Sequence, residues 1–334
     1  MKKYQVVVGV DVSKDHLDSY VIAGETEQHH RFDNSTTAIR SLIKHACSLL
    51  ACLPSQVLVC LEHTGVYAMP LCTELSEQNL DYALLAPIEL KRSLGLRRGK
   101  NDKADAKAIA RYAFLHQHEI QLYRLPEKIL SELKLLLAHR ERLMESRKVF
   151  MVASKETGDF LDKSICKHVI KDSNAVVLQL EKKIAKTEQS MLDLIDSSDE
   201  LKKLYELVSS VPGVGMQIAV SLIVITRCFT CFKDPRKLAC YAGVAPFEYS
   251  SGSSIHGRSK VSHMANKKIK ALLHMGALVA IKNDMQLKQY YERKKNEGKN
   301  AMSVINAVRN KLIARIFAVV NRGTPFVRLG QHAA

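Results

Sequence analysis

The apolar run that decides the fold is Gln5-Val6-Val7-Val8-Gly9-Val10-Asp11, an almost continuous β-branched stretch that ends on an acid. Such a run predicts a buried strand, and a carboxylate at the tip of a buried strand is costly unless it binds something. The same pattern recurs at Val57-Leu58-Val59-Cys60-Leu61-Glu62. Asp11 and Glu62 are therefore candidates for one acidic site.

A second pair of acids occurs in Lys100-Asn101-Asp102-Lys103-Ala104-Asp105-Ala106-Lys107, at the head of a predicted helix. Residues three apart lie on one helix face, about 5–6 Å apart at Cβ, so Asp102 and Asp105 point the same way. Their mutual repulsion is relieved when a cation lies between them, and a divalent metal suits that position. The plainer interpretation is an ordinary helix start, where acids are favoured.

The order of the predicted elements brings these acids into one architecture. Besides the two strands above, the pattern predicts strands at 17–22, 28–32 and 82–86, and helices after Ser35, after Gly65 and from Asp102. Three strands, helix, strand, helix, strand and then helices is the layout of an RNase H-like α/β fold.

In that fold the first and fourth strands are neighbours, so Asp11 and Glu62 would meet beside the helix that carries Asp102 and Asp105. Four carboxylates could hold two Mg²⁺ ions (or Mn²⁺) about 3.5–4 Å apart and act on a phosphodiester. The competing interpretation is four unrelated surface acids.

The second half of the chain has a different character. Apolar residues recur at helical spacing from Pro126 to about Leu207, with a break around 158–172, which predicts two long helices. They suit a coiled-coil spacer between protomers, or equally a packed helical hairpin within one chain. The predicted domains are 1–125 for the RNase H-like part, 126–207 for the spacer, 208–325 for a mostly helical part, and 326–334 for a tail.

Two segments of the helical part could contact a polyanion or react with it. The turn at 209–219 resembles a helix-hairpin-helix, in which Gly213 and Gly215 would leave backbone N–H groups open to a DNA phosphate; a tight turn between helices explains it equally well. The hydroxyl-rich stretch 242–258 is expected to be a flexible loop. A serine in it could attack phosphorus if a base, a metal or cations activate it, although a linker is the simpler interpretation.

Charge and composition define the class of protein. The chain has 334 residues and a net charge of +16, and residues 251–334 hold 16 Lys or Arg against three acids, which is +13 of that excess. A basic end of this kind favours nucleic acid as partner. No signal peptide and no apolar run of bilayer length occur, so we expect a cytoplasmic protein with no membrane role. The only CxxC, Cys228 to Cys231, lacks a second ligand pair, which argues against zinc.

Taken together, the motifs resemble a known family. They are Gly9-Val10-Asp11, Leu61-Glu62-His63-Thr64-Gly65, Asn101-Asp102-Lys103-Ala104-Asp105-Ala106, Pro212-Gly213-Val214-Gly215, and Ala242-Gly243-Val244-Ala245-Pro246 followed by Ser251-Gly252-Ser253-Ser254. The chain is similar to the insertion-sequence transposases that share a DEDD catalytic domain with the Piv DNA invertase, which are described as bridge-RNA-guided serine recombinases. Two places depart from the family pattern: His63 stands where many relatives have Ala, and Ser-Lys-x-Gly-Asn here reads Ser262-His263-Met264-Ala265-Asn266.

The resemblance implies a fold, a mechanism and partners. Asp11, Glu62, Asp102 and Asp105 would be the metal ligands of a RuvC-like domain, and Ser251 the nucleophile that forms a phosphoserine link to DNA. The partners would be donor and target DNA and a noncoding bridge RNA, in a homo-oligomer between dimer and tetramer at the bacterial nucleoid. The residues expected to contact nucleic acid are Arg97, Arg98, Lys100, Lys103, Gly213, Gly215, Arg258, Lys260, Lys267 and Lys268.

Other functions stay open on the sequence alone. The chain could be a Piv-type site-specific invertase, which flanking DNA would separate from a transposase. It could be a hydrolytic RuvC-like junction nuclease, which a trapped covalent protein–DNA adduct would exclude. It could also be an architectural DNA-binding protein without catalysis.

Overall fold

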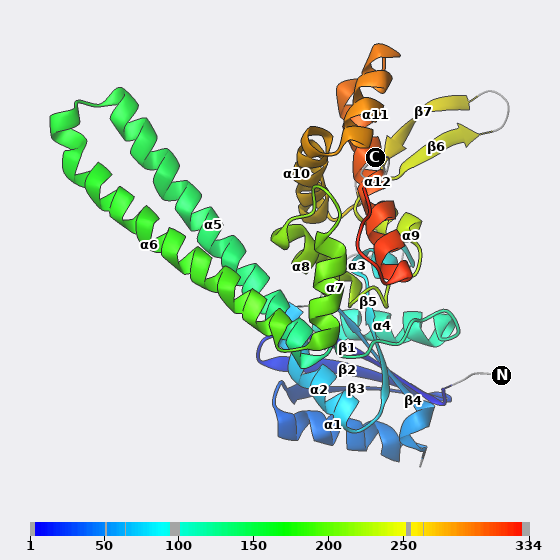
Figure 1. The fold of residues 1–334 in the computed structure, drawn as a ribbon. Coiled ribbons are helices and arrows are strands. Elements are labelled where there is room, and N and C mark those ends of the chain that lie inside the picture. The colour runs from blue at the N-terminus through cyan, green and yellow to red at the C-terminus, as the bar shows by residue number, and fades with distance from the viewer. Residues whose placement is uncertain are drawn as a thin grey trace. The chain divides into compact units, whose positions relative to one another are not determined.

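The computed structural model describes residues 4–50, 52–63, 65–93, 101–251, 255–262 and 264–328, which form two compact units, Met1–Leu125 and Pro126–Ala334 (Figure 1). The first unit contains β1 (Val6–Val12), β2 (His16–Ala23), β3 (Thr26–Asp33), α1 (Thr36–Ser48), η1 (Pro54–Gln56), β4 (Val57–Glu62), η2 (Gly65–Ala68), α2 (Met69–Glu77), β5 (Asp81–Leu85), α3 (Pro87–Ser93) and α4 (Asp102–His116). The second contains α5 (Lys128–Phe160), α6 (Lys163–Asp196), α7 (Asp199–Ser209), α8 (Met216–Thr226), α9 (Pro235–Tyr241), β6 (Pro246–Ser251), β7 (Ile255–Val261), α10 (Lys267–Asn283), α11 (Met285–Asn296) and α12 (Ala301–Arg322).

The first unit has one mixed sheet in the order β3-β2-β1-β4-β5. The meander of β1, β2 and β3 is antiparallel, whereas β4 and β5 run parallel to β1. This topology confirms the RNase H-like layout, with β1 beside β4 at the centre.

Helices cover both faces of this sheet (Figure 1). Because side chains alternate along a strand, Val6, Val8 and Val10 pack into one core with α1 and α2. Val7 points to the other face and packs with Ile109 of α4. A strand buried on both faces needs apolar residues at every position, which explains the continuous run in β1.

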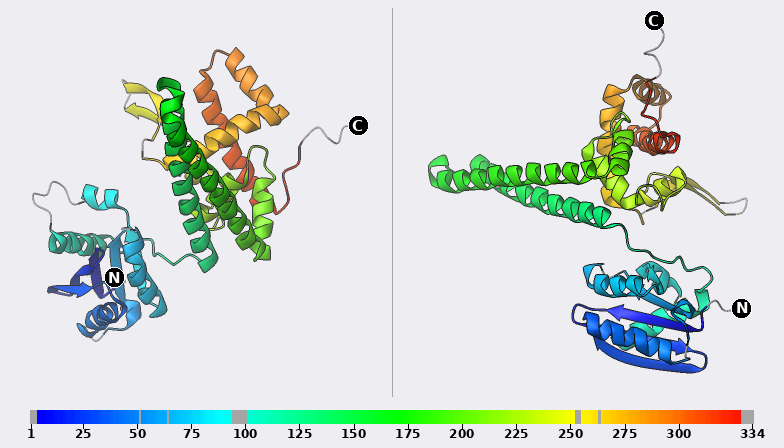
Figure 2. Two further views of the ribbon diagram at one scale, coloured as in Figure 1. Left: turned by 90° about the vertical axis from the view of Figure 1, so that its left-hand side faces the viewer. Right: turned by 60° about the horizontal axis from the view of Figure 1, so that its bottom comes forward.

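The second unit begins with a long antiparallel hairpin of α5 and α6 (Figure 2). The two predicted long helices are present and their break falls inside 158–172, but it is shorter than expected: only Leu161 and Asp162 separate the helices, and the Asp162 side chain caps α6. Arg140 pairs with Glu188 at 2.6 Å between the two helices. The hairpin is therefore tied within one chain, and pairing as a coiled coil between protomers stays a prediction.

The rest of the second unit is a helical core that carries a two-stranded ribbon. Val308 and Leu312 of α12 and Leu273 of α10 are fully buried in it. The expected flexible loop at 242–258 was wrong, since β6 and β7 form an antiparallel pair there. The alternating Phe247 and Tyr249 have high strand propensity, which the abundance of Ser and Gly in this stretch obscures. In the described part of the chain, every helix is too short or too polar to span a bilayer.

Candidate active site

The candidate acidic site depends on an unusually close contact between α4 and β1. A side chain on Gly9 would overlap the backbone nitrogen of Ala110 and the carbonyl oxygen of Ala106, and its Cβ would lie 2.7 Å from the Cα of Ala110. Only glycine therefore lets the helix backbone rest directly on the strand. Ala106 and Ala110 are themselves fully buried against the sheet, so small residues on both elements bring them together.

Charged contacts fix the orientation of α4 over the sheet. Lys107 donates to the Glu27 carboxylate of β3 at 2.9 Å, and its ammonium lies 4.8 Å from the centre of the Tyr20 ring of β2. The hydrogen bonds from Lys107 and Tyr20 lower the pKa of Glu27 to about 2. At the start of the helix, the side chain of Asn101 accepts the N–H of Ala104 at 2.7 Å. The first turn, which carries Asp102 and Asp105, is thereby held in place.

Strand register brings Asp11 and Glu62 to the same edge. Gly9 pairs with Cys60, and Val10 with Leu61, in the parallel β1–β4 ladder, so Asp11 and Glu62 are the next residues of the two strands. Alternation directs Asp11 to the face that bears Gly9, which is the face covered by α4. The predicted meeting of strand tips and helix start is therefore consistent with the geometry.

The electrostatics of Asp11 indicate that the acids lie near one another. Burial, and then the negative charges of Asp105, Asp102, Glu62 and Asp18 in that order, together raise the pKa of Asp11 to about 6. A half-buried carboxylate surrounded by like charges favours its protonated form. The same field that hinders ionisation attracts a cation.

Asp18 is an acid that the sequence analysis missed. It pairs directly with Asp11 in the antiparallel β1–β2 ladder and is buried. Its carboxylate contacts Nε2 of His29 at 2.8 Å and Nε of Arg31 at 3.7 Å, so its charge is partly balanced from β3. A tight turn at 13–15 between two antiparallel strands would have placed Asp18 opposite Asp11, so the sequence contained the signal for this acid.

The four acids have the right ligand atoms for a divalent cation, but their carboxylates are too far apart to hold one as they stand. Carboxylate oxygens are the ligands that Mg²⁺ and Mn²⁺ prefer, and burial together with the neighbouring negative charges raises the pKa of Asp11. Among the described residues, no three His, Cys, Asp or Glu side chains already stand close enough to hold one ion. Binding a metal would have to draw the carboxylates together.

The candidate nucleophile lies in the second unit. Ser251 is the last residue of β6 and pairs with Ile255 of β7, so it stands at the end of the ribbon. The start of the ribbon is held by α12, because Nδ2 of Asn306 donates to the carbonyl of Val244 at 2.7 Å. Asn306 in turn accepts from the buried Arg309 at 3.3 Å. The helical core thus positions the strand that leads to Ser251.

The predicted nucleic-acid contacts divide into several groups. Arg97, Arg98 and Lys100 lie outside the described residues. Arg258 and Lys260 lie in strand β7. Lys103 and Lys267 are exposed on α4 and α10.

The surroundings of Lys268, Gly213 and Gly215 affect how well each could contact a nucleic acid. Lys268 forms a 2.6 Å ion pair with Glu141 of α5, which partly neutralises it. Gly213 has φ +89°, and a side chain there would overlap the carbonyl of Gly276 on α10, so close helix packing accounts for this glycine. Gly215 has open space around its Cβ position and starts α8, where the first N–H groups lack acceptors within the helix.

Comparisons with known proteins point to DNA rearrangement. A family model described as "Transposase" matches residues 8–152, and one described as "Transposase IS116/IS110/IS902 family" matches residues 205–292. The chain is 25% identical over 328 residues to the pilin gene-inverting protein of Moraxella bovis, a match that covers 96% of this chain and 97% of that protein. It is 32% identical over 125 residues to an insertion element IS110 uncharacterized 43.6 kDa protein of Streptomyces coelicolor, covering 37% of this chain and 31% of that protein.

Among solved structures, T. thermophilus RuvC in complex with Holliday junction substrate matches with a TM-score of 0.28 and 14% identity. That match covers 36% of this chain and 100% of the RuvC chain.

Proposed function

Since the chain belongs to the IS116/IS110/IS902 family of transposases, we propose that it catalyses metal-dependent, site-specific DNA strand exchange. One observation carries the proposal: besides burial, the negative charges of Asp105, Asp102 and Glu62 raise the pKa of Asp11, so the other three acids act on Asp11 at the edge of the RNase H-like sheet. In this assignment residues 1–125 form the metal-binding domain, 126–207 the spacer and 208–325 the serine-bearing domain.

Asp11, Glu62, Asp102 and Asp105 would hold Mg²⁺ or Mn²⁺. When bound, the metal supplies positive charge that stabilises the attacking and leaving oxygens of a phosphodiester. The chain's own contribution is positional: Gly9 lets α4 approach β1, and Lys107 holds the helix on Glu27. Together these contacts set the distance between the two pairs of acids.

Ser251 is the proposed nucleophile. Its Oγ forms a bond to phosphorus while the bond from phosphorus to the departing DNA oxygen breaks, and the serine proton goes to that oxygen. The reverse reaction with a different DNA end rejoins the strands without hydrolysis. A covalent intermediate divides one difficult step into two easier ones and conserves the phosphodiester bond energy.

The proposed partners are donor and target DNA, with an element-encoded bridge RNA that pairs with both. The basic segment from 251 to 334, with 16 Lys or Arg against three acids, supports a nucleic-acid partner. A homo-oligomer between dimer and tetramer would let the acids of one protomer serve the serine of another.

A covalent-adduct assay tests the proposal. Purified full-length protein is mixed with Mg²⁺, the RNA transcribed beside its gene and end-labelled DNA carrying the flanking sequences, and protein-linked label is measured on a denaturing gel. We expect Ser251→Ala to lose the adduct and Ser250→Ala, the matched neighbour, to keep it. An adduct that survives in Ser251→Ala, or full strand exchange in excess EDTA, would contradict the proposal.

A second candidate is site-specific inversion, which the match to the pilin gene-inverting protein over 96% of this chain favours. The flanking DNA separates the two activities. Terminal element ends and an adjacent RNA gene indicate transposition, whereas an invertible segment between repeats indicates inversion. The covalent adduct separates both from hydrolysis by a junction nuclease, because hydrolysis leaves no protein-linked DNA.

A further inference from the structure

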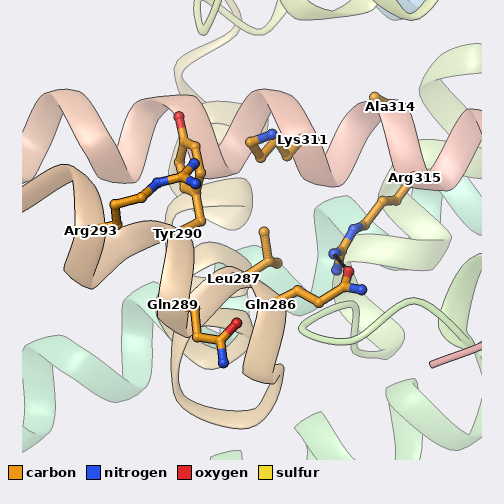
Figure 3. A pocket seen from close by; sticks show the side chains of 8 residues that line it. All are labelled: Gln286, Leu287, Gln289, Tyr290, Arg293, Lys311, Ala314 and Arg315. Carbon is orange, nitrogen blue, oxygen red and sulfur yellow. Dashed lines mark hydrogen bonds between the residues drawn. The ribbon is translucent and has the colours of Figure 1, made fainter. Parts of the chain in front are cut away.

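A basic groove of about 660 Å³ lies between α11 and α12, and none of the residues proposed so far lines it (Figure 3). Its polar side chains are Gln286, Gln289, Tyr290 and Arg293 from α11, and Lys311 and Arg315 from α12. Three of them are cationic, and among the described residues no acid lines the groove. Its volume lies in the range of ordinary ligand sites.

Two cations in the groove are organised by an aromatic ring. The Lys311 ammonium lies 4.6 Å from the centre of the Tyr290 ring, and the Arg293 guanidinium lies 5.8 Å from the same centre. Figure 3 shows both side chains converging on Tyr290 from different helices. A cation–π contact orders a side chain and leaves its charge unneutralised. Arg293 also forms an exposed ion pair with Glu297 at 3.9 Å, whereas among the described residues no ion pair involves Lys311. The Lys311 charge therefore remains available to an anion.

The other end of the groove is anchored differently. Arg315 pairs with the buried Asp284 at 3.1 Å and donates to Gln286 at 3.0 Å. The Arg315 charge is therefore largely balanced by Asp284, and the side chain lines one end of the groove. On α12, Lys311 and Arg315 are one turn apart with the small Ala314 between them, which leaves the groove open. The free positive charge is concentrated at the Lys311 end.

We propose that this groove binds the phosphate backbone of a nucleic-acid strand, with Lys311 and Arg293 contacting a phosphate and Gln286 or Gln289 hydrogen-bonding to the sugar–phosphate chain. Cations, amides and a tyrosine are the side chains that contact nucleic-acid backbones. Packed helices lie about 8–10 Å apart, so the groove between them accommodates one strand's backbone and not the full width of a duplex. The identity of the polyanion rests on the proposed function.

The test measures binding of the full-length protein to three labelled 20-nucleotide probes of one mixed sequence: single-stranded RNA, single-stranded DNA and duplex DNA. We expect Lys311→Ala to weaken binding about tenfold at low salt. It should also reduce the slope of log affinity against log salt by about 0.7–0.9, the value for one lost phosphate contact. A loss with RNA alone or with DNA alone identifies the strand that occupies the groove, and an equal loss with all three indicates the shared backbone.

Lys288→Ala is the matched control, because Lys288 is exposed on α11 but does not line the groove. Tyr290→Phe keeps the ring and should bind like the wild type, whereas Tyr290→Leu removes the cation–π contacts and should resemble Lys311→Ala. An unchanged slope in Lys311→Ala, or an equal loss in Lys288→Ala, overturns the proposal. The measurement needs no strand exchange, so the groove can be confirmed even if the Ser251 adduct is never found.

Discussion

Replacing Asp11 with Asn should abolish strand exchange and yet make the metal-free protein more stable at neutral pH. Folding raises the pKa of this carboxyl from 3.8 to about 6, through burial and through the charges of Asp105, Asp102 and Glu62. Folding therefore favours the protonated form, and the ionised form that exists at neutral pH opposes folding.

The size and sign of the effect follow from this shift. A pKa rise of about two units corresponds to a change of at most about 3 kcal/mol in the free energy of unfolding. Because Asp11 is partly exposed, solvent screening reduces this change to about 1–2 kcal/mol. The wild type has this stability in full below pH 3.8, and loses it as the pH rises through 6. The Asn variant does not titrate, so its advantage should be near zero at pH 4 and greatest at pH 8.

Urea unfolding in EDTA at pH 4, 6 and 8 measures this advantage, with Asp15→Asn, an exposed acid in the β1–β2 turn, as the matched control. Adding Mg²⁺ at pH 8 should stabilise the wild type but not Asp11→Asn, because a ligand that binds only the folded state raises its stability. If Asp11→Asn is no more stable than the wild type at pH 8, or if its gain is the same at pH 4, the acids do not converge as described.

Two other predictions concern glycines. Gly9→Ala should destabilise the first unit by roughly 1–3 kcal/mol in urea unfolding, because its Cβ must push α4 away from β1; a change below about 0.5 kcal/mol would refute this contact. Gly213→Ala should be similarly harmful, since φ +89° and the carbonyl of Gly276 both oppose a side chain, while Gly215→Ala should change stability little. Equal stability of the two variants would mean that packing on α10 does not account for Gly213.

The sequence was most informative where one periodicity dominates. The continuous apolar runs around Val8 and Val59 identified central strands, and the strand order then placed Asp11 next to Glu62. The start of α4 at Asp102 was predicted correctly, because acids favour the first turn of a helix, and the structure adds Asn101 as its cap. Local pattern and fold agree at each of these places.

The sequence was least informative where a contact joins distant segments. Lys311 and Tyr290 lie on different helices, so no spacing rule relates them, and the groove emerges only from the packing of α11 on α12. The β6–β7 ribbon was missed because Ser and Gly are abundant in it, although Phe247 and Tyr249 alternate as in a strand. The partial neutralisation of Lys268 by Glu141 likewise required the fold.

The contact of Gly9 has a genetic consequence. The atoms that a side chain at this position would meet are the main-chain nitrogen and Cα of Ala110 and the main-chain oxygen of Ala106, which every amino acid possesses. No exchange of side chains at 106 or 110 can therefore make room for alanine at position 9. Second-site suppressors of Gly9→Ala should arise in segments that set the distance of α4 from the sheet, such as the Lys107 and Glu27 pair, and not at the positions that the new methyl group touches.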